Sequence, residues 1–565
     1  MRKNLDKWIS SGTPFVWLNA GAVAVSILMV VGVLGVLVVK GMANFWPADV
    51  LQAEYQPPTE SGQIIVSQIL GESVDSETVL ASQIISSGIP VSDAQDFYIR
   101  QLIKRGNRDV SGADFAWVLS DFINMVSYPP GVMTLERREW GNFYGFLINL
   151  FENDISIMES DAAQGTDTDL WPEFSSRIER AISIQDSINK IEKEGIYEVN
   201  YELERLRLLE RGLEISNELD PAIIRGLEED RARLNEVYSG LQEELSSLHI
   251  EVERDRAVFL TADGSEKSIQ LADVVRAYRA NSLNILEKLM ICFSKISEFL
   301  TDEPREANTE GGIFPAIFGT VIMVLLMSVF VTPFGVVAAV YLREYAKQGT
   351  LTNIIRIAVN NLAGVPSIVY GVFGLGFFIY IVGGGIDQFF YNEALPAPTF
   401  GTPGLLWASL TLALLTVPVV IVSTEEGLAR IPRSVREGSL ALGATKFETL
   451  WRVVLPMASP AMMTGLILAV ARAAGEVAPL MLVGVVKLAP SLPVDGNYPY
   501  LHLDQQFMHL GFHIYDVGFQ SPNIEAARPL VFATALLLVV VIAILNFSAV
   551  SIRNRLREKY KSLDV

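Results

Sequence analysis

The chain has 565 residues, of which 50% are hydrophobic and 19% charged, with a mean hydropathy of +0.33 and a formal net charge of −20. This composition excludes an ordinary soluble globule, which is less apolar, and a chain embedded entirely in a membrane, which carries fewer charges. Residues 41–310 hold the acidity, with a net charge of about −25 against +3 for residues 1–40 and +2 for residues 311–565. The single cysteine, Cys292, excludes an internal disulfide framework and a multi-cysteine metal site, and its helical-looking surroundings predict a buried small apolar residue.

The first apolar segment runs from Phe15 to Val39 without a charge. At about 1.5 Å per residue it is long enough to cross a hydrocarbon core of about 30 Å. Basic residues at positions 2, 3 and 7 precede it, as they would in a signal peptide, but the run is longer than a signal-peptide core and lacks a clear small-residue cleavage site. We therefore expect an anchor that stays in the protein.

Five further apolar segments follow a long polar interval, which gives six predicted spans. They are Pro315–Leu342, Ile354–Gly383, Pro403–Ser423, Pro460–Val483 and Leu530–Val550. With the N-terminus inside, the inner segments hold sixteen lysines and arginines, and the short outer ones hold only Lys40, Lys487 and Arg528. This bias predicts cytoplasmic N- and C-termini, with residues 41–310 outside the membrane on the periplasmic side and residues 554–565 as a basic cytoplasmic tail.

The outer segment, residues 41–310, contains a leucine repeat that favours a mainly helical domain. Leucines recur every seven residues from Leu227 to Leu248, and apolar residues between them complete a four-heptad stripe that is broken only at Arg231. A less regular stripe lies upstream, and residues 217–221 separate the two. The pattern predicts a coiled-coil hairpin at about residues 175–258. It is either a docking stalk or self-packing architecture with a solvated acidic face, and we favour the second. No catalytic residues are recognisable here.

A loop that is long for a connector, residues 424–459, is predicted between the fourth and fifth spans. Glu437, Gly443 and Pro456 stand at positions 1, 7 and 20 of a pattern that also includes Leu455. This spacing resembles the EAA loop of ABC importer permeases, with Gly438 and Ser439 in place of the two alanines. We expect a short amphipathic helix at 436–442 that ends at Gly443 through a positive φ, and a second helix at 445–454 that stops at Leu455 and Pro456.

A helix of this kind fits a groove of an ATPase and passes its closure to the membrane helices, whereas the simpler alternative is an amphipathic loop on the membrane surface. We predict Glu437, Gly438, Gly443, Leu455 and Pro456 as ATPase-coupling residues. The sequence contains no Walker-type phosphate loop, so ATP and Mg are expected on a partner chain, with no cofactor bound by this one. The chain is therefore expected to be a transport subunit rather than an enzyme.

The fifth span carries two charges four residues apart, Arg472 and Glu476, on the same face of a predicted helix. Charges within a span are costly and usually face the interior of a bundle or a water-filled path. They form either a structural ion pair or a substrate path in which the arginine binds a tetrahedral oxyanion. Gly475 and Pro479 flank the pair and allow a break in the helix. His509 and His513 have a spacing that suits a metal, but the signal is weak and no metal site is assigned.

The region from about Arg305 to Arg553 resembles the PstA-type permease of the phosphate-specific ABC transporter. The matching stretches are REANTEGGIFPAIFGTV (305–321), TPFGVVAAVYLREYA (332–346), VPSIVYGVFGLGFF (365–378), the EAA-like loop and ARAAGEVAPL (471–480). Some members also share the first span that ends in Phe45, Trp46 and Pro47 and is followed by a large extracytoplasmic insertion. The resemblance covers just under half of the chain.

The resemblance implies an all-α integral membrane protein with a type I ABC importer permease core of five spans at 311–553. The implied partners are a homologous PstC-type permease, a cytoplasmic ATPase dimer and a periplasmic phosphate-binding protein, in addition to membrane lipids and without nucleic acid. The resemblance also places Arg472 and Glu476 on the phosphate path. The expected function is import of inorganic phosphate across the bacterial inner membrane by alternating access.

Two alternatives remain at this stage. One is the same machine with another oxyanion, such as molybdate or sulfate, as its cargo. A membrane receptor is a further alternative, because two spans that enclose a large outer domain are typical of receptors. A receptor requires a cytoplasmic signalling module after the second span, and only about ten polar residues, 343–353, separate the second and third spans.

Overall fold

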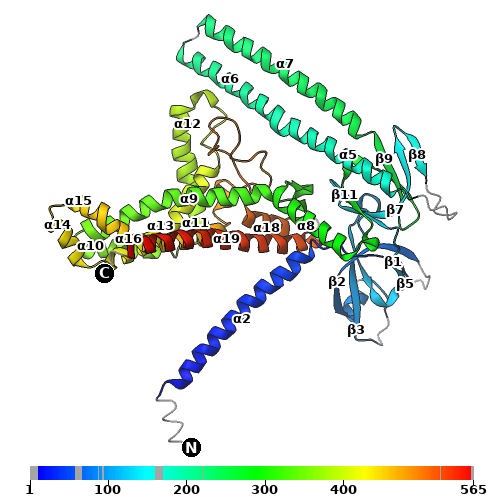
Figure 1. Cartoon of the computed structure of the whole chain (residues 1–565), viewed down its shortest axis with the longest axis horizontal. Coiled ribbons are helices and arrows are strands. Elements are labelled where there is room, and N and C mark those ends of the chain that lie inside the picture. The colour runs from blue at the N-terminus through cyan, green and yellow to red at the C-terminus, as the bar shows by residue number, and fades with distance from the viewer. Residues whose placement is uncertain are drawn as a thin grey trace, which may run out of the picture.

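The computed structural model describes residues 11–57, 66–86, 88–91, 95–159, 169–218, 220–521 and 524–561. Six of its helical segments are long and apolar enough to cross a membrane, which confirms the predicted number of spans. They are Phe15–Ala43, Phe314–Tyr345, Ser367–Phe390, Leu405–Arg430, Lys446–Gly475 and Ala527–Glu558. Figure 1 shows the strands at one end of the helical bundle, and α10, α14 and α15 at the opposite end.

Several spans combine α-helical and π-helical stretches. The first is α2 (Thr13–Ala43), and the second joins α9 (Phe314–Val340) to the π-helix η6 (Tyr341–Tyr345). The others are α11 (Ser367–Phe373) with η7 (Gly374–Gly383) and α12 (Gly384–Phe390), α13 (Leu405–Arg430), α15 (Lys446–Thr449) with η9 (Leu450–Val454) and α16 (Leu455–Gly475), and α19 (Ile524–Lys561).

The third span begins later than the sequence predicted. Residues 354–362 belong instead to a separate amphipathic helix, α10 (Thr350–Leu362), and the span itself starts at Ser367. Pro366 separates the two helices because it lacks an N–H and disfavours helical geometry in the residue before it. Arg356 fixes α10 to α13 by donating to Glu425 at 2.6 Å. The predicted start at Ile354 was therefore wrong, since the apolar residues there form one face of a surface helix.

The fifth span is shifted toward the N-terminus relative to the prediction of 460–483. The helix runs from Lys446 to Gly475, and the chain at Glu476 is extended, with φ −83° and ψ 131°. The predicted stop at Leu455 and Pro456 was wrong as well. The π-helical turn η9 lies directly before Leu455, and its wider spacing accommodates a proline that would clash in a regular α-helix.

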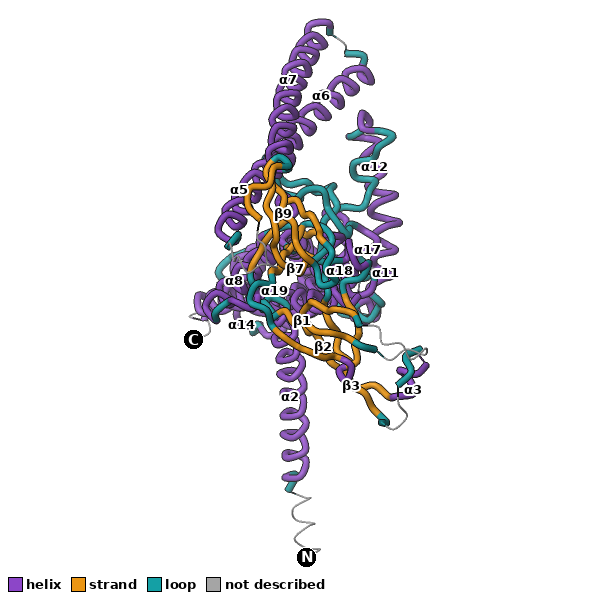
Figure 2. The backbone as a smooth tube through the Cα atoms, turned by 90° about the vertical axis from the view of Figure 1, so that its right-hand side faces the viewer, coloured by secondary structure: helices purple, strands orange, loops and turns teal. Residues whose placement is uncertain are grey.

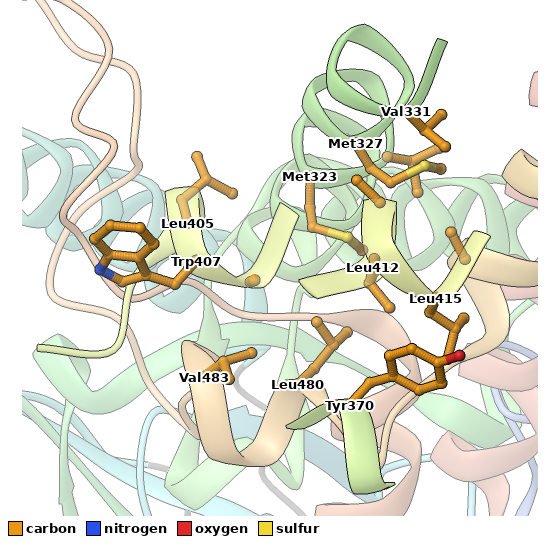
Figure 3. Packing of buried hydrophobic residues seen from close by; sticks show 14 of the residues in the cluster. Met323, Met327, Val331, Tyr370, Leu405, Trp407, Leu412, Leu415, Leu480 and Val483 are labelled. Atoms are coloured by element: carbon orange, nitrogen blue, oxygen red, sulfur yellow. The ribbon is translucent and has the colours of Figure 1, made fainter. Parts of the chain in front are cut away.

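The core of the bundle forms around α13, the most buried of the spans. Leu405, Trp407 and Leu412 of α13 are buried against side chains from α9, α11 and α17 (Leu480–Val483). Figure 3 shows Met323, Met327, Val331, Tyr370, Leu480 and Val483 converging on this helix. The close approach of α9 to α13 also requires a glycine at position 335, where an added Cβ would lie 2.6 Å from a side-chain carbon of Val420. The interior is therefore packed around one central helix.

The insertion between the first two spans contains antiparallel sheets that the sequence did not predict. One sheet has the strand order β4-β3-β2-β1-β5, and the other has the order β10-β9-β7-β6-β11 with β8 paired to β7. The first comprises β1 (Val50–Tyr55), β2 (Ser67–Leu80), β3 (Phe97–Lys104), β4 (Phe115–Leu119) and β5 (Ile123–Ser127). The second comprises β6 (Met133–Arg137), β7 (Asn142–Glu152), β8 (Ile155–Glu159), β9 (Asp255–Leu260), β10 (Glu266–Gln270) and β11 (Val274–Tyr278).

Short elements complete the insertion. These are α3 (Ala81–Ser86), α4 (Arg108–Ser111), the two-residue strands β12 (Pro304–Arg305) and β13 (Glu310–Gly311), and the helix α8 (Ile285–Thr301). The core of the second sheet is formed by Phe143, Phe174 and Phe259, whose rings meet edge to face at 5.4 and 5.8 Å between centroids. The bundle of spans is thus joined to an α+β insertion that has a hydrophobic core of its own.

A helical hairpin rises from the second sheet. Its first arm comprises α5 (Trp171–Lys190), the π-helix η2 (Ile191–Ile196) and α6 (Tyr197–Ser216), and its second arm is α7 (Pro221–Val252). Its helices thus run over 171–252, compared with the expected 175–258. The turn is formed by Asn217, in the left-handed region at φ 56°, and by Asp220, which caps α7 by accepting from the N–H of Ala222.

The hairpin lies across outer connections of the bundle. Tyr201 donates to the carbonyl oxygen of Tyr498, and its ring packs edge to face on His502 at 5.8 Å between centroids. Tyr197 lies 3.4 Å from Ser491, atom Oγ, and α6 also contacts the turn Asn392–Ala394. Figures 1 and 2 both show the hairpin projecting to one side of the molecule and α2 to the other. One helix therefore touches the connections that follow two different spans.

Within the part of the chain that the structure describes, the first span packs against other elements near its C-terminal end. Gly41 packs against the backbone of Phe532 and Ala533 in α19, and the ring of Phe45 lies 5.1 Å from that of Phe299 in α8. The preceding residues of α2 are exposed over its whole apolar length. The predicted burial of Cys292, also on α8, is confirmed.

Candidate functional site

The loop between the fourth and fifth spans is a compact helix-turn-helix. After α13 ends, α14 (Arg433–Ala441) forms a short helix, and Gly443 then takes φ +87°. Only glycine reaches that region without strain, so the predicted turn at Gly443 is confirmed in its conformation. Thr445 then begins the next helix with a capping box, in which it accepts from the N–H of Glu448 and the carboxylate of Glu448 accepts from the N–H of Thr445.

Arg436, which the sequence interpretation did not single out, fixes α14 to the bundle. Its guanidinium donates to the carbonyl oxygens of Ile431 and Leu428 at 2.7 and 2.8 Å and to the carboxylate of Glu344 at 2.8 Å. Lys446 donates to the carbonyl oxygen of Glu344 at 2.6 Å. Because Glu344 lies at the end of the second span, the helix-turn-helix is bound to that span as well as to its own neighbours.

The predicted coupling residues fall into two groups. Glu437 and Gly438 lie exposed on α14, whereas Leu455 and Pro456 are half-buried at the start of α16, where the loop joins the span. Gly443 lies between the two groups, at the turn. The exposed residues are accessible from outside the bundle, and the half-buried ones join the loop to the membrane helix.

The helix-turn-helix that carries Glu437 also exposes large apolar side chains. Leu442 is 91% exposed, and the rings of Phe447 and Trp451, both 65% exposed, stack in parallel at 6.3 Å. Exposed apolar clusters of this kind mark protein–protein contacts. Phe447 and Trp451 were missed, although an aromatic pair four residues apart on an amphipathic helix is a readable signal.

Arg472 and Glu476 lie close together at a break in the fifth span. Arg472 is in the last turn of α16, and Glu476 follows the end of the helix rather than sharing its face, which corrects the predicted helical pair. Their side chains, 33% and 22% exposed, are 3.4 Å apart between Nε and Oε1. A second N–H of Arg472 donates to the carbonyl oxygen of Ala363 at 3.5 Å. Both distances are long for hydrogen bonds, so most of the donor capacity of the guanidinium is left for another acceptor.

Two unwound segments meet at this arginine. One follows Gly475, and the other is the Leu362–Pro366 turn between α10 and α11, where Tyr370 donates to the carbonyl oxygen of Leu362 at 2.7 Å. Gly371 of α11 lets this helix pack closely on the segment after Gly475, since an added Cβ would lie 2.7 Å from Cα of Pro479. Broken helices that present backbone and a charged side chain at the same depth are typical of substrate sites in transporters.

The outer histidines have structural roles in the described residues. His502 pairs with Asp495 at 2.8 Å, and His509 caps α18 (Leu510–Phe519) by accepting from the N–H of Gly511 at 3.1 Å. His513 is buried on α18 itself. Within the described parts of the chain, no group of three or more His, Cys, Asp or Glu side chains is arranged to hold a metal ion.

A family model described as a binding-protein-dependent transport system inner membrane component matches residues 331–558. This range includes the helix-turn-helix, Arg472 and four complete spans. Its start within α9 excludes the sheets and the hairpin from the match.

Curated relatives match a comparable share of the chain. The phosphate transport system permease protein PstA 1 of Mycobacterium tuberculosis (strain CDC 1551 / Oshkosh) is 34% identical over 247 residues, which are 43% of this chain and 71% of the relative. The phosphate transport system permease protein PstC of Xylella fastidiosa (strain Temecula1 / ATCC 700964) is 30% identical over 36% of this chain and 65% of its own length. Among solved structures, the inward-facing MetNI methionine ABC transporter aligns with a TM-score of 0.30 and 18% identity, over 43% of this chain and 94% of the matched one.

Proposed function

This chain belongs to the family of binding-protein-dependent transport system inner membrane components, among the phosphate transport system permeases, and on that premise we propose that it moves inorganic phosphate across the membrane. It is a permease subunit of an ABC importer. The direction of transport in the proposal is inward, from the periplasm to the cytoplasm of a bacterium, by alternating access.

The observation that carries the cargo assignment is the environment of Arg472. A guanidinium presents five N–H donors in a rigid fork that matches the oxygens of a phosphate, and here only two donors have protein acceptors, both at long distance. Glu476 orients the fork and also places a negative charge beside the site. A nearby carboxylate weakens anion binding, which suits a path that must release its cargo.

The exposed helix-turn-helix supports the coupling assignment. Its exposed residues at one end of the bundle include Glu437, Gly438, Leu442, Phe447 and Trp451. Arg436 and Lys446 join it to the second span through Glu344. In the proposal a cytoplasmic ATPase dimer, which binds ATP and Mg, docks here. Leu455 and Pro456 then pass its closure to α16, and with it to Arg472.

The arrangement of the ends supports the proposed orientation. Figure 1 places α10, α14, α15 and the C-terminus at one end of the bundle and the sheets at the other. Described lysines and arginines of the inner segments, such as Arg343, Arg433 and Lys446, belong to the first end, which we assign to the cytoplasm. The insertion is then periplasmic. A PstC-type permease would complete the pathway, and a periplasmic phosphate-binding protein would deliver the cargo.

The experiment that tests this function is ATP-dependent uptake of radiolabelled phosphate by proteoliposomes that contain the chain with its partner subunits. Arg472→Ala and Arg472→Lys are compared with Arg343→Ala, which removes an exposed arginine of η6. We expect both Arg472 variants to lose at least about tenfold in uptake, because each charge-assisted hydrogen bond contributes about 1.5–3 kcal/mol. Arg343→Ala should retain uptake.

A parallel variant tests coupling. Glu437→Lys should lose association with the ATPase and therefore uptake, while its level in the membrane stays normal. Wild-type uptake of molybdate or sulfate, without uptake of phosphate, would leave the importer intact and contradict the cargo. Normal uptake by Arg472→Ala would show that Arg472 does not lie on the phosphate path.

A further inference from the structure

The helix α8 (Ile285–Thr301) has three chemically distinct faces. It connects the second sheet to α9, the second span. A capping box fixes its start: Asn284 accepts hydrogen bonds from the N–H groups of Leu286 and Glu287. Its C-terminal end abuts the next span directly, since the N–H of Ile313 donates to the carbonyl oxygen of Phe299 at 2.9 Å. The helix is therefore held rigidly at the boundary between insertion and bundle.

The charged face of α8 binds the insertion. Lys295 pairs with Glu136 of β6 at 2.5 Å, and Glu298 accepts from Arg276 of β11 at 2.7 Å. Lys288 reaches Asp49, at the start of the insertion, at 2.6 Å. These ion pairs orient the charged face toward the sheets.

A second, narrower face packs on the bundle. Cys292 and Phe299 are buried in a cluster with Ile313 and with α19 residues such as Leu530. Phe45, at the end of the first span, contacts Phe299 in the same cluster. Leu530 belongs to the sixth span, Phe45 follows the end of the first span, and Ile313 directly precedes the second.

The third face of α8 is apolar and uncovered. At 100° per residue its side chains fall within an arc of about 140° that extends along the whole helix. The exposed fraction reaches 70% for Ile285 and 69% for Phe293. The exposed apolar residues of the arc are Ile285, Leu286, Leu289, Met290, Phe293 and Leu300. The arc also contains Ile296, which is half-buried against the bundle, and one polar residue, Ser297.

We propose that this arc lies in the lipid bilayer, at the boundary of headgroups and acyl chains in the leaflet that faces the insertion. The face continues the surface of the spans beside it, because α8 ends against the start of α9 and touches the end of α2, whose apolar length is exposed throughout. A helix with an apolar arc on one side and fixed charges on the other lies flat in that boundary. The insertion is thereby seated on the membrane surface rather than held away from it.

The lipid contact of the insertion does not depend on which anion the permease carries. A protein partner on the same arc is the competing occupant. The two differ in what reaches the arc: acyl chains admit oxygen and exclude a polar nickel chelate, whereas a protein partner excludes both and water admits both.

The single native cysteine makes the test practicable. In a Cys292→Ala background of the full chain in lipid nanodiscs, a spin label is placed at Met290→Cys or, on a neighbouring turn, at Phe293→Cys. Val31→Cys on α2 provides the lipid reference, and Ser239→Cys on the hairpin provides the aqueous one. Circular dichroism and the unfolding temperature identify any variant that has lost its fold.

We expect the ratio of oxygen to nickel-chelate collisions at Met290→Cys and Phe293→Cys to approach that of Val31→Cys and to exceed that of Ser239→Cys by roughly fivefold. A ratio equal to that of Ser239→Cys would place the arc in water and overturn the proposal. Low collision rates for both reagents would show a protein cover and overturn it equally.

Discussion

Lys295 of α8 and Glu136 of β6 form an ion pair of 2.5 Å that joins the helix before the second span to the strand beside the edge of the second sheet. Arg276 shares the same carboxylate at 2.6 Å. Burial raises the pKa of the Glu136 carboxyl, but the opposing charges of Lys295 and Arg276 outweigh it and lower that pKa to about 2. The pair therefore connects the two parts of the chain through charges that remain ionised.

Replacing Glu136 with glutamine should destabilise the insertion strongly. The change leaves Lys295 and Arg276 without their shared counter-charge, and removal of one partner from a buried pair costs about 3–5 kcal/mol. Glu159→Gln makes the same substitution at an exposed position of β8 in the same sheet. Thermal unfolding of the full chain in detergent should show a clearly lower midpoint for Glu136→Gln only, and equal midpoints would contradict the importance of the pair.

Acid should destabilise the outer connections in a window set by two histidines. Burial lowers the pKa of His509 to about 4, and burial with the nearby Lys487 charge lowers that of His513 to about 4 despite Asp516. The unfolded chain, with histidine pKa values near 6.5, binds more protons between these limits. Stability is therefore lost as the pH falls from about 6.5 through 4.

The double variant His509→Asn, His513→Leu should remove this loss, since asparagine retains the helix cap and leucine cannot be protonated. Unfolding midpoints measured between pH 7 and pH 4 should then change less than in the wild type. His249→Gln alters an exposed histidine of α7 and should behave as the wild type does. If the double variant is as sensitive to acid as the wild type, the loss of stability comes from other groups and not from these histidines. Glu136, whose pKa is lowered to about 2, titrates below this pH range.

Two glycines of the helix-turn-helix should respond oppositely to alanine. Neither Gly438 nor Gly443 has an atom within 4 Å of an added Cβ, but Gly438 is helical whereas Gly443 has φ +87°. Gly438→Ala should stabilise α14 by about 1 kcal/mol. Gly443→Ala should destabilise the turn by about 1–2 kcal/mol. Hydrogen exchange of the amides of residues 433–441 measures both effects, and a change of the same sign in the two variants would refute the argument.

Close packing beside Arg472 should matter for transport. Gly371→Ala places a Cβ 2.7 Å from Cα of Pro479 and 3.0 Å from its carbonyl oxygen, so the backbone next to Glu476 must move. Overpacking of this kind costs about 1–3 kcal/mol, and we expect phosphate uptake to fall severalfold. Gly376→Ala, in the same span but with nothing within 4 Å, is the matched control. Equal uptake by both variants would show that the contact does not position the arginine.

The spans and the helix-turn-helix were predictable because their signals are local. An uncharged apolar run of sufficient length specifies a span wherever it occurs, and Gly443 between two amphipathic segments indicates a turn without reference to the rest of the fold. The errors at the third and fifth spans have a local origin too. Apolar residues on one side of α10 were counted as part of a span, and Pro456 was taken as a stop without allowance for a π-helical turn.

The sheets were not predictable in the same way, since their strands pair over long separations. β7 pairs with β9 across more than a hundred residues, with Leu150 opposite Ala257, and the whole hairpin lies between them. The register shifts between Leu147 and Asn149, so that no clean alternation marks the segment. The partners of Arg472 also come from distant segments, as Ala363 shows.

The contact of α6 with the outer connections has a mechanical consequence. Tyr201 and Tyr197 touch the segment after the fifth span, and the same helix touches the turn after the third. The free tip at Asn217 lies about 24 Å further along, at 1.5 Å per residue. A rotation of these loops by about 10° would carry that tip by roughly 4 Å, so the length of the hairpin would amplify small movements of the loops after the third and fifth spans.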